Sequence, residues 1–170
     1  MVEVVVDRLG VDSSTNSYVV ILRERYGRRI LPIWIGTPEA ESIVIHINQH
    51  KRERPLTHDL CKALIMALGG TLRRVTISRV HDNTYYAELH LDRENARIEV
   101  DARPSDSIAI ALRLDAPIFA HESLLVSPDG DEGDESDAPP SAPPADDMSS
   151  TQLQAYLAAL RPEDFGKFKP

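Results

Sequence analysis

The chain has 170 residues, of which 42% are hydrophobic, so it can form a hydrophobic core and is not disordered as a whole. It has no run of the roughly 18 uncharged apolar residues that a membrane helix needs. Its start lacks the basic and apolar regions of a secretory signal. The single cysteine, Cys61, cannot form an internal disulfide. These features predict a cytoplasmic protein without a membrane segment.

The formal net charge of -8 is concentrated in one part of the chain. Residues 128–150 hold eight acidic residues and no lysine or arginine, which leaves the rest of the chain neutral. Composition therefore does not indicate a general electrostatic binder of nucleic acid. We predict a folded body over residues 1–126 and a disordered, acidic, Pro-rich linker over residues 127–150.

The last segment, residues 151–170, is predicted to be a short amphipathic helix followed by a tail. Its apolar side chains recur at helical spacing and would share one face: Leu153, Tyr156, Leu157 and Leu160. We expect this helix to dock on the body of the protein or on a protein partner.

Within the body, alternating apolar residues and turn clusters predict three strands, at 2–11, 18–22 and 29–35, joined as an antiparallel meander. A helix then starts with Thr37 as N-cap, and a second starts with Thr57 as N-cap and stops at Gly69. Strands at 71–80, 84–91 and 96–102 follow, then a helix from residue 104 and a strand at 117–120. This order predicts an α+β fold with an antiparallel or mixed sheet and three helices.

Each of the three helix starts is dense in polar residues, in segments 35–41, 54–59 and 101–106. Helix N-termini present free N–H groups and attract phosphate, and an arginine fork binds phosphate through two hydrogen bonds. If the helix starts converge, they form an anion-binding cleft. The predicted substrate-binding residues are Arg54, Thr57, Arg103 and Ser105.

The same segments hold residues suited to acid–base chemistry or to metal binding. His58 gains nothing from the helix dipole when it is charged, and Asp59 beside it could hold it as a base. Carboxylates that could hold a divalent ion such as Mg²⁺ or Mn²⁺ are Glu39, Asp59, Asp101 and Asp106. Their spacing is not diagnostic of a metal site. A plainer alternative is that these acidic and hydroxyl residues only cap helices or complement helix dipoles.

The segments Pro32–Ala40, Arg54–Leu60 and Asp101–Ala109 resemble the signature runs of the bifunctional nuclease domain family. That family is credited with DNase and RNase activity and with a dimeric domain, and the resemblance covers residues 1–126. It implies a homodimer with DNA and RNA as substrates. At the matching positions, Arg54 and Arg103 would bind phosphate, and His58 and Asp59 would transfer protons. Glu39, Asp101 and Asp106 would orient a metal ion or the attacking water.

We therefore expect a nuclease with little sequence preference, assisted by a divalent metal. The rival hypothesis is a non-enzymatic module that binds a small anion or a protein partner at the helix starts. A third reading is a scaffold in which the polar motifs only cap helices.

Overall fold

The computed structural model describes residues 1–12, 17–50, 53–82, 84–94 and 96–128. The predicted terminal helix, and the predicted linker beyond residue 128, lie outside the described residues. The elements are β1 (Val2–Asp12), β2 (Ser17–Glu24), β3 (Ile30–Ile35), α1 (Thr37–Ile47), α2 (Thr57–Ala67), β4 (Gly70–His81), β5 (Thr84–Arg93), β6 (Ala96–Ala102), α3 (Pro104–Arg113), β7 (Ile118–Ala120) and a short 3₁₀ helix, η1 (Glu122–Leu124).

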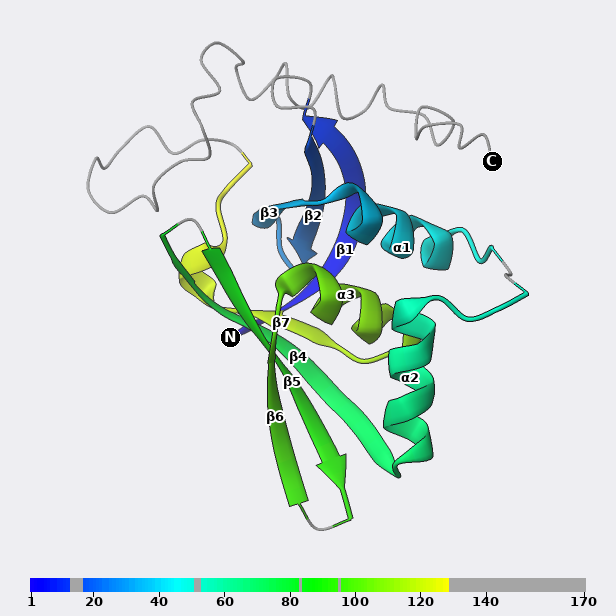
Figure 1. Ribbon diagram of the computed structural model, residues 1–170. Helices are drawn as coiled ribbons and strands as arrows, with labels where there is room; N and C mark the ends of the chain where they lie inside the picture. Colours follow the sequence, from blue (N-terminus) through cyan, green and yellow to red (C-terminus); the bar gives the residue numbers. More distant parts are fainter. Residues whose placement is uncertain (13–16, 51–52, 83, 95, 129–170) are drawn as a thin grey trace.

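One mixed sheet contains all seven strands, in the order β3-β2-β1-β7-β4-β5-β6. The first three strands form the predicted antiparallel meander, and β4, β5 and β6 form a second one. The short strand β7 joins the two halves, because it pairs antiparallel with β1 and parallel with β4 (Figure 1). The predicted α+β class is confirmed.

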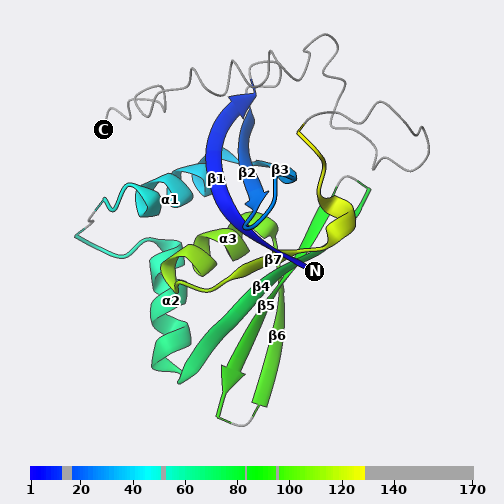
Figure 2. The same cartoon turned by 180° about the vertical axis from the view of Figure 1, so that it is seen from behind.

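Helices α1 and α3 lie side by side on one face of the sheet, as the front and back views show (Figures 1 and 2). Apolar residues from both helices and from the central strands form the core between the two layers. The most deeply buried of these side chains are Val20, Leu22, Ile43, Val75, Ile77 and Ile108. The packing of α1 against α3 positions the starts of the two helices relative to each other.

Helix α2 packs less deeply than the other two helices. None of its residues is fully buried, although Cys61 and Ile65 contact the core. Large apolar side chains of α2, including Leu60, Leu64 and Met66, are exposed instead. The helix ends at Ala67 with Leu68 as its C-cap, and Gly69 follows with a φ of 74°, in the left-handed region that glycine tolerates best. In the described part of the chain, no helix is long and apolar enough to cross a membrane.

The predicted N-caps are wrong by one residue. The N-cap positions are held by Gly36 and Leu56, so Thr37 and Thr57 are the first helical residues. Arg103 is the N-cap of α3. No side chain of these three N-cap residues accepts a capping hydrogen bond from a backbone N–H of the first turn. Pro38 and Pro104 lack an N–H group and suit the first turn of α1 and α3.

Candidate active site

Arg103 connects the starts of α1 and α3. Its Nη2 lies 2.9 Å from Oε1 of Glu39, in the first turn of α1. Its Nε donates to Oδ2 of Asp106 at 2.7 Å, and its Nη2 donates to Oδ1 at 3.2 Å. The Arg103 side chain is nevertheless 67% exposed. The guanidinium therefore stands at the surface, between two helix starts and two carboxylates.

His58 brings the start of α2 to the same place. Its Nε2 lies 3.0 Å from Oδ1 of Asp106, and its Nδ1 lies 2.7 Å from Oγ of Ser42 in α1. Asp106 as a carboxylate can only accept, so a neutral His58 carries its proton on Nε2. The Ser42 hydroxyl then donates to Nδ1. Glu39, Arg103, Asp106, His58 and Ser42 thus form one polar chain, called here the helix-start network.

Hydrogen bonds in this network keep Asp106 ionised. Burial alone would raise the pKa of this carboxyl, but the bonds from Arg103 and His58 outweigh it and lower the pKa below its usual value. The carboxylate in turn raises the pKa of the Arg103 guanidinium. The network therefore holds an ionised Asp106 carboxylate against the Arg103 guanidinium at neutral pH.

Asp59 belongs to a different cluster from His58. Its Oδ1 accepts from Nε of Arg113 at 2.6 Å, and its Oδ2 accepts from the backbone N–H of Leu56 at 3.0 Å. Burial would raise the pKa of Asp59, but these bonds lower it overall. Arg113 is 3% exposed and also donates to the carbonyls of Ala109 and Ser42. Asp59 therefore caps α2 and ties it to α1 and α3.

The other four predicted residues lie outside the helix-start network. Arg54 is exposed and lines a hollow of about 510 Å³ together with Asp59 and Arg113. Thr57 is exposed at the start of α2, whereas Ser105 is buried in the first turn of α3. Asp101 is exposed on β6, opposite Glu88 of β5. In the described part of the chain, the network's hydrogen bonds include none of these four.

The carboxylates as arranged do not fit a metal site. Both oxygens of Asp106 accept from Arg103 or His58, and Glu39 pairs with the same guanidinium. A cation placed there would lie beside a permanent positive charge. Among the described residues, no three His, Cys, Asp or Glu side chains are grouped so that they could hold a metal ion.

Sequence reasoning did not find two members of these clusters, Ser42 and Arg113. Ser42 is 7% exposed and lies next to the buried Ile43 in α1. A polar residue beside the apolar face of a predicted helix was the sequence feature that could have identified it. Arg113 follows Asp106 by two helical turns, which places both on one face of α3. A buried arginine needs an acidic partner, so a buried position for Arg113 would have indicated a carboxylate such as Asp59 beside it.

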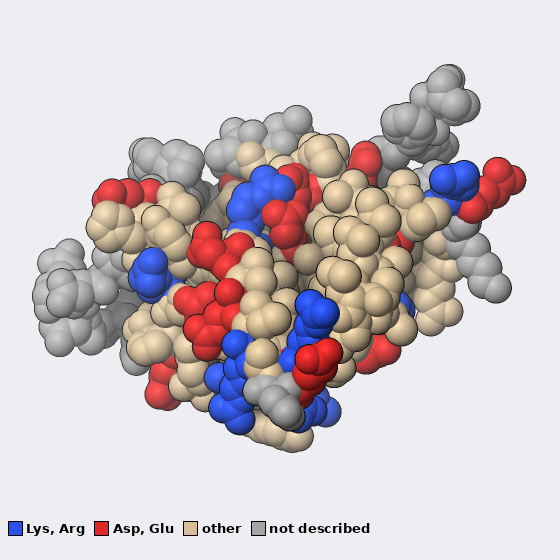
Figure 3. Space-filling view, turned by 60° about the horizontal axis from the view of Figure 1, so that its bottom comes forward, with Lys and Arg blue, Asp and Glu red and all other residues tan. Residues whose placement is uncertain are grey.

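One face of the molecule carries charges of both signs. On the face in Figure 3, Lys and Arg side chains lie beside Asp and Glu side chains and do not merge into a single basic area. The described residues of this face therefore form no broad positive field of the kind that attracts a polyanion.

This fold and site define an α+β domain with a charged network at the starts of three helices. A family model described as the bifunctional nuclease domain matches residues 20–129. The chain belongs to the bifunctional nuclease domain family.

Two kinds of relatives match the chain. An uncharacterized protein of Mycobacterium tuberculosis is 41% identical over 165 residues, which cover 97% of this chain and 98% of that protein. Bifunctional nuclease 2 of rice (Oryza sativa subsp. japonica) is 29% identical over 119 residues, covering 68% of this chain and 37% of the rice protein. Bifunctional nuclease 2 of Arabidopsis thaliana is 28% identical over 116 residues, covering 66% of this chain and 35% of that protein. The match to these plant proteins thus includes little more than a third of their length.

Proposed function

We propose that this protein is a nuclease that hydrolyses phosphodiester bonds of DNA and RNA at the helix-start network. Family membership and the names of the plant relatives support nuclease chemistry. The observation that carries the choice of site is the exposed Arg103 guanidinium between the starts of α1 and α3. Helix starts without side-chain caps leave N–H groups free for phosphate oxygens, and the guanidinium adds a planar fork.

In this proposal Arg103 binds the phosphate and neutralises the charge that develops on its oxygens. Glu39, whose side chain is 16% exposed, takes a proton from the attacking water. The water oxygen forms a bond to phosphorus as the bond to the leaving oxygen breaks, and the leaving oxygen takes up a proton from solvent. His58 is 12% exposed and has both ring nitrogens engaged, so it holds Asp106 and thereby Arg103 in position.

The direct test measures cleavage of single-stranded DNA and RNA oligonucleotides by the purified full chain. Arg103→Ala should lower the rate by at least about a hundredfold, since it removes the phosphate-binding charge. Arg73→Ala is the matched control, because Arg73 is also an exposed arginine paired with an aspartate. Equal rates in wild type and Arg103→Ala would exclude this site.

A chelator tests the predicted divalent metal separately. Loss of cleavage in EDTA, restored by Mg²⁺ or Mn²⁺, would support a metal bound together with substrate. Absence of cleavage under all conditions, with tight binding of inorganic phosphate that Arg103→Ala abolishes, would favour the non-enzymatic anion-binding module.

We also propose that the protein is a homodimer joined through β6. This strand is an edge of the sheet, and Ile98 and Val100 are exposed on its helix-bearing side. Antiparallel pairing with a second copy, centred on Ile98, would place Arg97 opposite the partner subunit's Glu99. Two copies of β6 would therefore match in charge when paired antiparallel. The backbone N–H and C=O groups at the free edge of β6 would form hydrogen bonds with the partner strand.

A further inference from the structure

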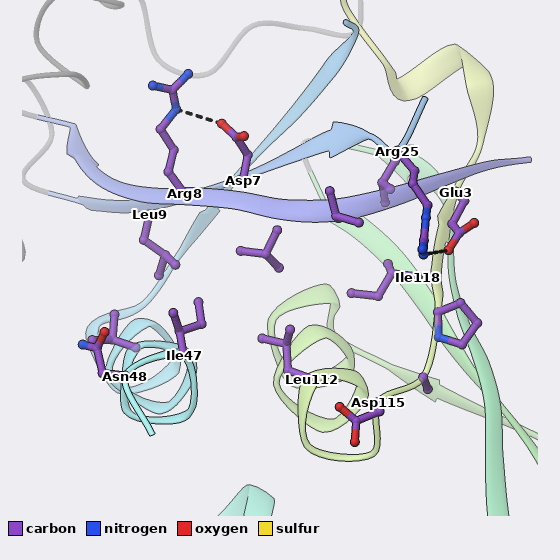
Figure 4. A pocket seen from close by; sticks show the side chains of 16 residues that line it. Glu3, Asp7, Arg8, Leu9, Arg25, Ile47, Asn48, Leu112, Asp115 and Ile118 are labelled. Atoms are coloured by element: carbon purple, nitrogen blue, oxygen red, sulfur yellow. Dashed lines mark hydrogen bonds and ion pairs between the residues drawn. The ribbon is translucent and has the colours of Figure 1, made fainter. Parts of the chain in front are cut away.

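A groove with a volume of about 630 Å³ lies between β1 and the C-terminal ends of α1 and α3 (Figure 4). Its walls are apolar, with Leu9 on the strand side and Ile47 and Leu112 on the helix side. Ile47 is 47% exposed although it belongs to the apolar face of α1. The groove is separate from the helix-start network, which lies at the opposite ends of the same two helices.

The charged residues around the groove are mostly paired with one another. Arg8 contacts Asp7 at 3.1 Å, and Arg25 contacts Glu3 at 2.7 Å. These pairs neutralise each other, and Asp115 is the remaining charged residue of the lining. Such a groove suits an apolar, uncharged ligand surface better than a polyanion.

The described chain ends in the half of the sheet whose strand β1 lines this groove. Val126 pairs with Ile30 through two backbone hydrogen bonds of 2.8 Å at the outer edge of β3. Strands β2 and β1 follow next in the sheet, so Val126 lies about 15 Å from β1 at the usual strand spacing. Residues 129–150 are 22 residues long, and a coil of that length would have a root-mean-square reach of about 26 Å. The segment that follows can therefore reach the groove of its own chain.

We propose that residues 151–160 form a helix that docks in this groove of the same chain. The segment has no charged residue and carries its large apolar side chains, Leu153, Tyr156, Leu157 and Leu160, at helical spacing. These side chains would cover Leu9, Ile47 and Leu112. This inference goes beyond the nuclease function and does not depend on it.

The alignment with the mycobacterial relative includes a counterpart of this segment. The family model ends at residue 129, but the alignment with the mycobacterial protein leaves only five residues of this chain unmatched. That alignment therefore extends to residue 165 or beyond, through the whole segment. A tethered helix is held near its groove at an effective concentration on the order of millimolar, so modest apolar burial is enough to dock it.

Amide hydrogen exchange of the full chain tests the proposal. A helix of ten residues is marginal in water by itself, so protection of amides 151–160 requires docking. We expect exchange at least about tenfold slower than for an unstructured segment. Leu157→Asp should abolish this protection, whereas Ala155→Asp, on the opposite face of the predicted helix, should preserve it.

A change in the groove completes the test. Ile47→Glu should release the segment, and Met66→Glu, at an exposed apolar position of α2, should not. Unprotected amides in the wild type would overturn the proposal. So would protection that survives Ile47→Glu, or protection that increases with protein concentration, since the latter indicates docking on a second copy. None of these readouts requires nuclease activity.

Discussion

The hydroxyl of Ser42 lies 2.7 Å from Nδ1 of His58, and this contact joins the middle of α1 to the first turn of α2. Because the Asp106 carboxylate accepts from Nε2 of His58, the Ser42 hydroxyl donates to Nδ1 and satisfies the second ring nitrogen. A continuous set of hydrogen bonds thus connects the buried Ser42 through His58 to Asp106. Asp106 in turn accepts a hydrogen bond from Arg103.

Ser42→Ala should therefore weaken both folding and activity. We expect a loss of about 1 kcal/mol in the free energy of unfolding, measured by urea denaturation, together with a lower cleavage rate. Ser123→Ala is the matched control, because Ser123 makes a 2.7 Å contact with Nδ1 of His121 at an exposed position. Equal effects of the two variants would show that the Ser42 contact has no special role.

Asp106 should make the stability of the protein depend on pH in the acid range. Its pKa is lowered in the folded state, so its contribution is fully present above the usual value of 3.8. The contribution is lost as pH falls through the lower, folded-state pKa. Below about pH 4, the wild type should lose more stability with falling pH than Asp106→Asn. Parallel curves for the two proteins in urea denaturation would contradict this expectation.

The sequence predicted most of the elements because their signals are local. Alternating apolar residues mark the strands, and Pro38 and Pro104 mark helix starts, although the N-cap residues were displaced by one position. The sequence raised the convergence of the helix starts only as a condition, and the structure brings Glu39, His58, Arg103 and Asp106 together. The sequence could not predict that His58 and Asp59, although adjacent, belong to two different hydrogen-bonded clusters. This separation depends on Ser42 and Arg113, whose contacts join α1, α2 and α3 across long stretches of chain.

Asp59→Asn separates a structural role of Asp59 from a catalytic one. The change leaves the buried Arg113 without its carboxylate, so we expect destabilisation by about 2 kcal/mol. Asp92→Asn, which removes the partner of the exposed Arg73, should cost less than about 1 kcal/mol. The fraction of Asp59→Asn that remains folded should cleave at nearly the wild-type rate. A large loss of activity in fully folded protein would instead support the predicted catalytic role.

Gly36→Ala should displace Glu39 from Arg103. A Cβ atom at residue 36 would collide with Oε2 of Glu39, which then has to turn away from the helix start. We expect a lower cleavage rate with little change in the melting temperature. Gly27→Ala is matched in chemistry, because a Cβ there would collide with Oε2 of Glu24, which pairs with Arg29 away from the site. An equal loss of activity in both variants would argue against a role for Glu39.

Charge exchange on β6 tests the proposed dimer and its register. Arg97→Glu places like charges opposite each other across the two copies, because residue 97 would then face the partner subunit's Glu99. Glu99→Arg does the same with positive charges, and each single variant should weaken the dimer by about tenfold or more in sedimentation equilibrium. The double variant restores opposite charges in the same register and should recover most of the affinity.

A monomeric wild type would refute the dimer, and failure of the double variant to recover the affinity would refute this register. Within the monomer Glu99 also lies 3.3 Å from Nδ1 of His90, so the unfolding free energy of each variant is measured in parallel.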